Sequence, residues 1–261
     1  SILESKLLKN ISIKRKLNPI TIGVKNSNLK IINHKFIGNQ QEVKFIFKND
    51  EYSFVTNLIG KIQIKNLIMA IIAANNCGLS MKRIIKSISR IKPVKGRFEQ
   101  IGNLKNNSKV ILDYAHTPDA LKTCLLNLRS QFKLNKISIV FGCGGNRDKT
   151  KRPMMGKIAN NLCDRIYLTD DNPRNENPKK IRREIKKKIN KLKLFEISSR
   201  KKAISDAIRN INSGDVLLVA GKGHENYQEY FNKRFFSDSE CIIKNIKHRN
   251  NKLLNDWKLN I

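Results

Sequence analysis

The stretch KISIVFGCGGNRDKTKRP, residues 136–153, decides the fold of this chain of 261 residues. Its apolar run Ile137–Phe141 has the length of a buried strand, and the glycine-rich loop after it leads into a helix expected from about Pro153. The same order of strand, polar loop and helix recurs along the chain. Further strands are expected at 110–112, 165–168 and 216–219, and further helices from about 118, 178 and 238 and over 201–210. This alternation predicts an α/β, Rossmann-like domain with a mostly parallel sheet and helices on both faces.

The residues before this region have a different hydrophobic pattern. Short apolar runs predict strands, and a helical pattern at 64–76 then ends at Gly78. Ser80 is expected to cap a second helix that runs to about Arg90. The expected strands are 20–24, 29–32, 43–47 and 52–55, with a hairpin turn around Asn49-Asp50. The stretch 91–107, with its proline and glycines, is interpreted as an inter-domain linker, which predicts a domain over 1–95 and another over 96–261.

The composition restricts the class of protein. Lys and Arg number 53 against 21 Asp and Glu, a formal net charge of +32. A nucleic-acid partner would explain this charge, but the basic residues are spread along the whole chain and aromatic residues are few, so compositional drift is the better explanation. The longest apolar run, 67–74, is far shorter than the ~20 residues of a membrane span. The five cysteines show no CxxC spacing, which favours a reducing, cytoplasmic compartment without disulfides or a zinc site.

Polar loops follow each expected parallel strand, at the edge where ligands bind in such sheets. Asp113 and His116 follow the strand 110–112, and they can hold a nucleotide hydroxyl or transfer a proton, or serve only in a turn before the helix. The loop after Ile137–Phe141 carries Arg147, whose guanidinium suits a carboxylate or a phosphate, although a solvated basic turn is an equal alternative. Arg147 occupies the position of the last glycine in a GxGxxG fingerprint, and the chain contains no GxxxxGK[ST] P-loop.

The other two loops carry groups that match a zwitterion. Asp171 lies near Arg174 in the sequence DDNPR, so a carboxylate can hold an ammonium while the guanidinium holds a carboxylate; an Asx turn is the alternative. Glu225 follows Gly221 in the loop after 216–219 and is a second acidic candidate for an amine. Because the carboxyl ends of parallel strands meet at one edge, these loops together predict one binding site there.

Five segments of the chain occur in the order seen in Mur ligases: GRFE (96–99), DYAHTPD (113–119), FGCGGNRDKTKRP (141–153), DDNPR (170–174) and GKGHENYQ (221–228). The chain therefore resembles the Mur ligase family, and within it the members that add meso-diaminopimelate. The resemblance implies the end of a central ATP-binding domain over 1–95, lacking the P-loop, and a complete amino-acid-binding domain over 96–261. Since the chain lacks the P-loop and begins with Ser1, we expect an incomplete copy, with the N-terminal and P-loop domains present in the complete protein.

The activity implied by the resemblance is an ATP-dependent amide ligation in cytoplasmic peptidoglycan synthesis. ATP, with Mg²⁺, would phosphorylate the D-glutamate carboxylate of UDP-N-acetylmuramoyl-L-alanyl-D-glutamate, and the amino group of meso-diaminopimelate would then displace phosphate. Without the P-loop half, the chain alone is expected to be inactive.

The resemblance also implies residue roles. Nucleotide contacts fall on Asn66, Arg97 and Asp113, His116 is a candidate catalytic residue, and no metal ligand is expected in this chain. Diaminopimelate would be held by Arg147, Asp171, Asn172, Pro173, Arg174, Gly221 and Glu225.

Within that set, Arg174 would hold the distal carboxylate, while the Gly221 carbonyl and Glu225 would hold the distal ammonium. Because lysine lacks the distal carboxylate, Arg174 predicts diaminopimelate rather than lysine as the substrate. A lysine-adding ligase remains the nearest alternative. A basic nucleic-acid-binding protein, or a nucleotide-binding module without catalysis, represents another class.

Overall fold

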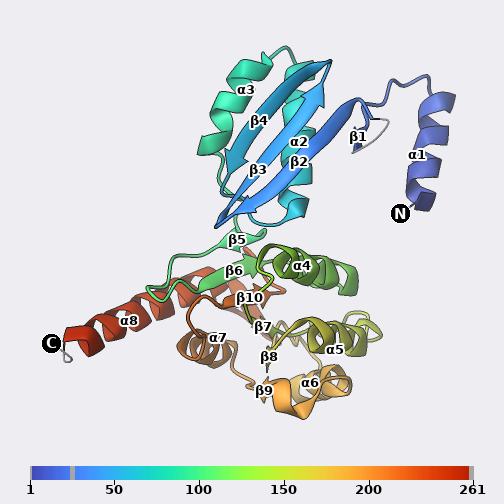
Figure 1. The fold of residues 1–261 in the computed structure, drawn as a ribbon. Coiled ribbons are helices and arrows are strands. Elements are labelled where there is room, and N and C mark those ends of the chain that lie inside the picture. The colour runs from blue at the N-terminus through green and yellow to red at the C-terminus, as the bar shows by residue number, and fades with distance from the viewer. Residues whose placement is uncertain (1, 24–26, 259–261) are drawn as a thin grey trace. The chain divides into compact units, whose positions relative to one another are not determined.

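The computed structural model describes residues 2–23 and 27–258, and these divide into two compact units. The first unit contains the residues up to 57 and residues 65–91, and the second contains 58–64 and the residues from 92 onward. Figure 1 labels the elements of both units.

The first unit is built on a four-stranded sheet. Its strands are β1 (Ile22–Gly23), β2 (Leu29–Ile37), β3 (Gln40–Phe47) and β4 (Asp50–Thr56), in that order, with β1 parallel to β2 and the other pairs antiparallel. Alternate residues of β3 are buried, including Val43 and Phe45, because successive side chains of a strand point to opposite faces. Its helices are α1 (Ile2–Lys14), α2 (Lys61–Asn76) from residue 65 onward, and α3 (Met81–Ser87), followed by a 3₁₀ turn at Ile88–Arg90.

Most elements expected in the first unit are present, with adjusted ends. The hairpin turn consists of Lys48 and Asn49, both at positive φ, between β3 and β4. Gly78 has a φ of 92° just after α2, as expected for a helix end. Ser80 does occupy the N-cap of α3, but its side chain makes no capping hydrogen bond. Of the expected strand 20–24, only Ile22–Gly23 is strand, and residue 24 lies outside the described residues. Helix α1 was not expected.

The second unit contains the predicted parallel sheet. The strand order is β5-β6-β10-β7-β8-β9, and every pair is parallel except β5 with β6. The bounds are β5 (Glu99–Gln100), β6 (Lys109–Asp113), β7 (Ile137–Phe141), β8 (Arg165–Leu168), β9 (Leu194–Glu196) and β10 (Val216–Ala220). Strand β10 is the last of these in sequence, yet it lies between β6 and β7.

Helices cover both faces of this sheet, as the alternation of elements predicts (Figure 1). On one face, α4 (Pro118–Gln131), α5 (Lys151–Leu162) and α6 (Pro178–Lys186) bury residues such as Leu125 and Ile185. On the other, α7 (Arg200–Arg209) and α8 (Asp238–Lys258) bury Ile204 and Ile242. The expected α/β class is therefore confirmed.

The expected linker over 91–107 is wrong in most of its length. Glu99–Gln100 form β5 against β6, and Phe98, Ile101 and Leu104 are buried in the second unit. Strand β9, a second 3₁₀ turn at Lys191–Lys193, and the hairpin of β11 (Tyr227–Tyr230) and β12 (Asn232–Phe235) were not expected. Helix α5 begins two residues before Pro153.

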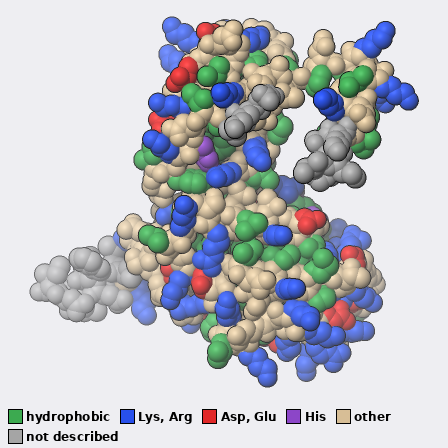
Figure 2. Space-filling view, turned by 45° about the vertical axis from the view of Figure 1, so that its right-hand side comes forward, with side chains coloured by type: hydrophobic (Ala, Val, Ile, Leu, Met, Phe, Trp, Pro, Cys, Tyr) green, Lys and Arg blue, Asp and Glu red, His purple; other side chains and the backbone are tan. Residues whose placement is uncertain are grey.

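Lys and Arg side chains occur over both units on the face shown in Figure 2, among apolar and uncharged polar groups. They do not form a single basic stripe there. In the part of the chain that the structure describes, no helix combines the length and the apolar character needed to cross a bilayer.

Candidate functional site

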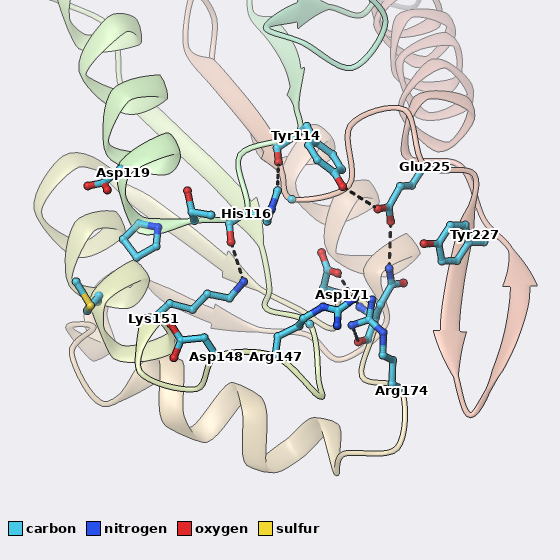
Figure 3. A pocket seen from close by; sticks show the side chains of 16 residues that line it. Tyr114, His116, Asp119, Arg147, Asp148, Lys151, Asp171, Arg174, Glu225 and Tyr227 are labelled. Carbon is cyan, nitrogen blue, oxygen red and sulfur yellow. Dashed lines mark hydrogen bonds between the residues drawn. The ribbon is translucent and has the colours of Figure 1, made fainter. Parts of the chain in front are cut away.

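A cavity of about 730 Å³ opens at the carboxyl ends of the parallel strands of the second unit (Figure 3). Because β10 lies between β6 and β7, the loops after β6, β10, β7 and β8 meet at this edge. Six residues predicted for the acceptor site line the cavity: Arg147, Asp171, Asn172, Arg174, Gly221 and Glu225. Pro173 does not line it; its carbonyl oxygen packs against Gly145 instead.

Arg174 is held in place by the chain while part of its guanidinium stays available. Its Nη1 donates to the Gly145 carbonyl oxygen at 2.8 Å, and its Nε lies 3.3 Å from the Glu229 carboxylate. The residue has a φ of 54°; its backbone N–H donates to the Glu229 carbonyl oxygen of β11, and its carbonyl oxygen accepts from the Phe231 N–H. Its Nη2 has no hydrogen-bond partner among residues 2–23 and 27–258, so one arm of the fork can receive an anion.

Asp171 is supported from behind by the fully buried Arg200 of α7. The Nε and Nη2 of Arg200 donate to the Asp238 carboxylate at 2.8 and 2.7 Å, and Nη2 also donates to the Ala220 carbonyl oxygen. Its Nη1 lies 3.9 Å from the Asp171 carboxylate and has no hydrogen-bond partner in the described chain. Burial lowers the pKa of the Arg200 guanidinium, but the Asp238 carboxylate outweighs this and raises it above its ordinary value. Arg200 thus ties the starts of α7 and α8 to two loops of the site.

The loop after β10 passes unusually close to Asp171. Gly221 has a φ of 113°, and a Cβ there would lie 2.8 Å from the Asp171 Oδ2 atom, so this approach requires glycine. Two residues further on, Gly223 packs against the Gly96 backbone, which docks the GRFE segment onto the same loop.

Glu225 and Asn172 form a hydrogen-bonded pair with a lysine that was not singled out from the sequence. The Asn172 Nδ2 donates to the Glu225 Oε2 at 3.1 Å, and the buried Lys222 Nζ contacts both residues. The Tyr114 hydroxyl lies 3.4 Å from Glu225 Oε1. Burial and the charge of Glu225 raise the pKa of the Tyr114 hydroxyl, so it remains a donor.

The opposite side of the cavity is more open. Arg147 is exposed, and its guanidinium has no ion-pair partner among the described residues. His116 is also exposed and lines the cavity; its Nδ1 lies 2.9 Å from the Tyr114 carbonyl oxygen, which can only accept. Nδ1 is therefore the donor of this contact, and an imidazole that donates from Nδ1 has Nε2 as its basic nitrogen. Lys151 Nζ donates to the His116 carbonyl oxygen at 2.9 Å and lies on the same side (Figure 3).

The three residues expected to contact a nucleotide have different surroundings. Asp113 is 9% exposed and accepts hydrogen bonds from the Phe98 and Ala115 N–H groups and from the Cys124 thiol, so its carboxylate organises the chain itself. Arg97 is exposed, and its guanidinium carbon lies 4.4 Å from the Tyr114 ring centroid.

Asn66, the third of them, is exposed on α2 in the first unit. None of these three lines the cavity, and their contacts with a nucleotide stay predictions. In the described parts of the chain, no group of three or more His, Cys, Asp or Glu side chains could hold a metal ion.

Sequence reasoning missed Lys222, Arg200 and the two tyrosines, Tyr114 and Tyr227, that line the cavity. Lys222 stands inside the GKGHENYQ segment, but nothing local distinguishes a buried lysine from an exposed one in so basic a chain. Arg200 follows Ser199, which caps α7 and is a local signal of a helix start only.

Comparison with known proteins gives a consistent result for this unit. Residues 96–223 match the family model described as "Mur ligase, glutamate ligase domain". A protein of Rickettsia felis named UDP-N-acetylmuramoyl-L-alanyl-D-glutamate–2,6-diaminopimelate ligase is 42% identical over 245 residues, which cover 93% of this chain and 45% of that protein. The protein of the same name from Rickettsia rickettsii is 45% identical over 230 residues, covering 87% of this chain and 47% of its own length.

A solved structure carries the same name. It is 29% identical to this chain, with a TM-score of 0.68, and the match covers 94% of this chain and 51% of that one. The chain spans about half the length of the curated relatives it matches. On the family model, the two relatives and the shared fold, the chain belongs to the Mur ligase family.

Proposed function

We propose that the cavity of the second unit binds the acceptor amino acid of an ATP-dependent ligase that adds meso-diaminopimelate to UDP-N-acetylmuramoyl-L-alanyl-D-glutamate. One observation carries the proposal: two arginines and two carboxylates, Arg147, Arg174, Asp171 and Glu225, line a single cavity. Diaminopimelate has an ammonium and a carboxylate at each end, so it needs cationic and anionic partners within one site. The names of the Rickettsia relatives support the same substrate.

Each group of the ligand has a suitable partner. The free Nη2 of Arg174 can bind the distal carboxylate, and the exposed Arg147 can bind a second carboxylate. The Gly221 carbonyl oxygen and the Glu225 carboxylate can accept from the distal ammonium. His116, with its basic Nε2 in the same cavity, is a candidate to take the proton that the attacking amine releases.

The proposed reaction joins the diaminopimelate amino group to the D-glutamate carboxylate of the precursor. ATP supplies the phosphoryl group that activates this carboxylate as an acyl phosphate, and phosphate leaves when the amine attacks. Arg97 is an exposed cation in the GRFE segment that suits a phosphate, whereas the Asp113 carboxylate is already engaged by the chain. Mg²⁺ would offset the phosphate charge, and our proposal assigns its ligands to the P-loop half of the ligase.

The first unit is assigned, within this proposal, to the end of the central ATP-binding domain, with Asn66 of α2 directed to the nucleotide. The proposed boundary at residues 95 and 96 falls near the division between the two units. All five cysteines are free thiols, which suits a cytoplasmic ligase. The complete activity requires the N-terminal and P-loop domains, so the chain alone is expected to be inactive.

The proposal is tested by calorimetric titration of the chain with meso-diaminopimelate and with L-lysine. Wild type should bind diaminopimelate in preference to lysine, and Arg174→Ala should weaken diaminopimelate binding by at least about 30-fold, because the distal carboxylate loses its charged partner. Arg183→Ala, which removes an exposed arginine of α6, is the matched control and should bind like wild type.

Each other outcome has a definite meaning. Equal binding of both amino acids would favour a lysine-adding ligase and remove the specificity assigned to Arg174. Failure of the wild-type chain to bind either amino acid would count against an acceptor site in this unit.

A further inference from the structure

Lys222 is a fully buried cation that contacts the ligand-binding loops. It is 0% exposed, directly after Gly221 at the end of β10. Its Nζ donates to the Asn172 Oδ1 at 3.0 Å and to the Glu225 Oε2 at 3.1 Å, and it lies 5.0 Å from the Tyr227 ring centroid. A lysine is rarely buried to this extent unless its charge is paired, so these contacts account for its position.

The first contact determines which way the Asn172 amide faces. The Oδ1 atom accepts from two donors, the Lys222 Nζ and the Glu229 backbone N–H at 3.1 Å. A flipped amide would place its NH₂ group against both donors, and neither the Lys222 ammonium nor the Glu229 N–H would then have Asn172 as its acceptor. The Nδ2 atom is therefore directed at Glu225, where it donates to Oε2.

The second contact determines which oxygen of Glu225 remains for a ligand. Oε2 accepts from both Lys222 and Asn172, whereas among the described residues Oε1 contacts only the Tyr114 hydroxyl, at a long 3.4 Å. Figure 3 shows the Glu225 carboxylate at the cavity, with the Tyr114 hydroxyl beside it. One carboxylate oxygen is thus used for support, and the other keeps capacity for an added donor.

We infer that Lys222 is a positioning residue of the acceptor site. Its ammonium holds Asn172 and Glu225 in the arrangement that presents Glu225 Oε1 to the distal ammonium of the bound amino acid. The inference rests on the proposed function, because it names how the same site recognises its ligand. It goes further in two ways. It assigns recognition of the distal ammonium to Glu225 Oε1, and it assigns the orientation of that oxygen to Lys222, which does not line the cavity.

The experiment compares two ligands that differ by one amino group. Meso-diaminopimelate has the distal ammonium, whereas L-2-aminopimelate keeps both carboxylates and the proximal amine but lacks it. The variant is Lys222→Met, which keeps an unbranched side chain and removes the charge. The matched control is Lys233→Met, because Lys233 is exposed on β12 and also approaches the Tyr227 ring, at 4.8 Å.

Lys222→Met should weaken diaminopimelate binding by about 10- to 100-fold, the range of one charge-assisted hydrogen bond, and leave 2-aminopimelate binding within about twofold. Lys233→Met should change neither. A role in general stability alone would weaken both ligands equally and would overturn the inference. Tighter binding of diaminopimelate by Lys222→Met would also overturn it, because the two ammonium groups would then be competitors for Glu225.

A measurement without ligand separates this inference from the proposed function. Lys222→Met should speed hydrogen exchange of the Glu229 N–H and of the Asn172 side-chain amide relative to Lys233→Met, because Asn172 loses the contact that orients it. Unchanged exchange would overturn the positioning role, whether or not the chain binds an amino acid. Wild type could fail to bind either ligand while the difference in hydrogen exchange is present. This result would overturn the proposed function and the role of Lys222 in ligand binding, but it would support the positioning of Asn172 by Lys222.

Discussion

At the residue scale, Arg200 is the clearest case of a buried charge that the fold depends on. Arg200→Met leaves the Asp238 carboxylate, itself 0% exposed, without its cation. We expect a loss of about 3–5 kcal/mol in the free energy of unfolding, measured by urea denaturation followed by circular dichroism. Adding Asp238→Asn to this variant should recover part of the loss, because no uncompensated buried charge then remains.

Arg209 provides the control on the same helix. It is 72% exposed and lies 3.4 Å from Asp206, an ordinary surface pair. Arg209→Met should change the unfolding free energy by less than about 0.5 kcal/mol. Similar losses for the two arginines would mean that the buried pair contributes no more than a surface pair.

At the element scale, the start of α6 is determined by a cap that the sequence displays. The Asn177 side chain accepts from the Lys179 and Lys180 N–H groups, and Pro178 occupies the first helical position. Asn177→Ala should lower the unfolding free energy by about 1 kcal/mol in urea titration, because these N–H groups lose their acceptor. Asn177→Asp should retain it, since a carboxylate also accepts and favours a helix N-terminus.

Asn175→Ala is the comparison for this cap, since Asn175 is exposed two residues earlier and lies outside the helix. The unfolding free energy of the Asn175→Ala variant should stay near that of wild type. If the two alanine variants were equally stable, the capping interaction would contribute nothing measurable.

Elements of this kind were predictable because their signals are local. The strands β7 and β8 were expected with their observed bounds, since each is a short apolar run that ends in a polar loop. Strands β5 and β9 are two and three residues long at the edges of the sheet, too short for a periodicity. The hairpin of β11 and β12 turns at Phe231, with a φ of 57°, a conformation that an aromatic residue rarely adopts.

At the scale of the whole molecule, carboxylates held by cations make stability depend on pH. Burial would raise the pKa of Asp164, but hydrogen bonds from the Ile137 N–H and Arg129 outweigh it and hold the pKa below the ordinary value of 3.8. The pKa of Glu196 is likewise held below 4.5, despite its burial, by lysine and arginine partners. As the pH falls, these carboxylates therefore take up protons at a higher pH in the unfolded chain than in the folded chain.

The unfolding free energy should accordingly be greatest above about pH 5 and decrease as the pH falls through the ordinary and then the folded pKa values. Urea titrations between pH 6 and pH 3 measure this. Asp164→Asn should lessen the decrease because it removes one titrating group, whereas Glu240→Gln, at an exposed site, should follow wild type. A steeper decrease in Asp164→Asn would contradict the assigned direction of the pKa shift.

The sequence by itself determined the α/β class, most of the strands and helices, and the loops that carry the site. These follow from hydrophobic periodicity, caps and short motifs, all of which act over a few residues. It also determined the family, through five ordered segments that contain Arg147, Arg174 and Glu225.

Only the tertiary structure decided that β10 lies between β6 and β7, and therefore which loops share one cavity. It also decided that the Asp113 carboxylate accepts a hydrogen bond from the Phe98 backbone N–H. Lys222 is buried against Asn172, although the two residues are 50 positions apart in sequence. The physical reason is that burial and the pairing of charges depend on residues that are distant in sequence and adjacent in space, and no local pattern encodes which distant partner a side chain will meet.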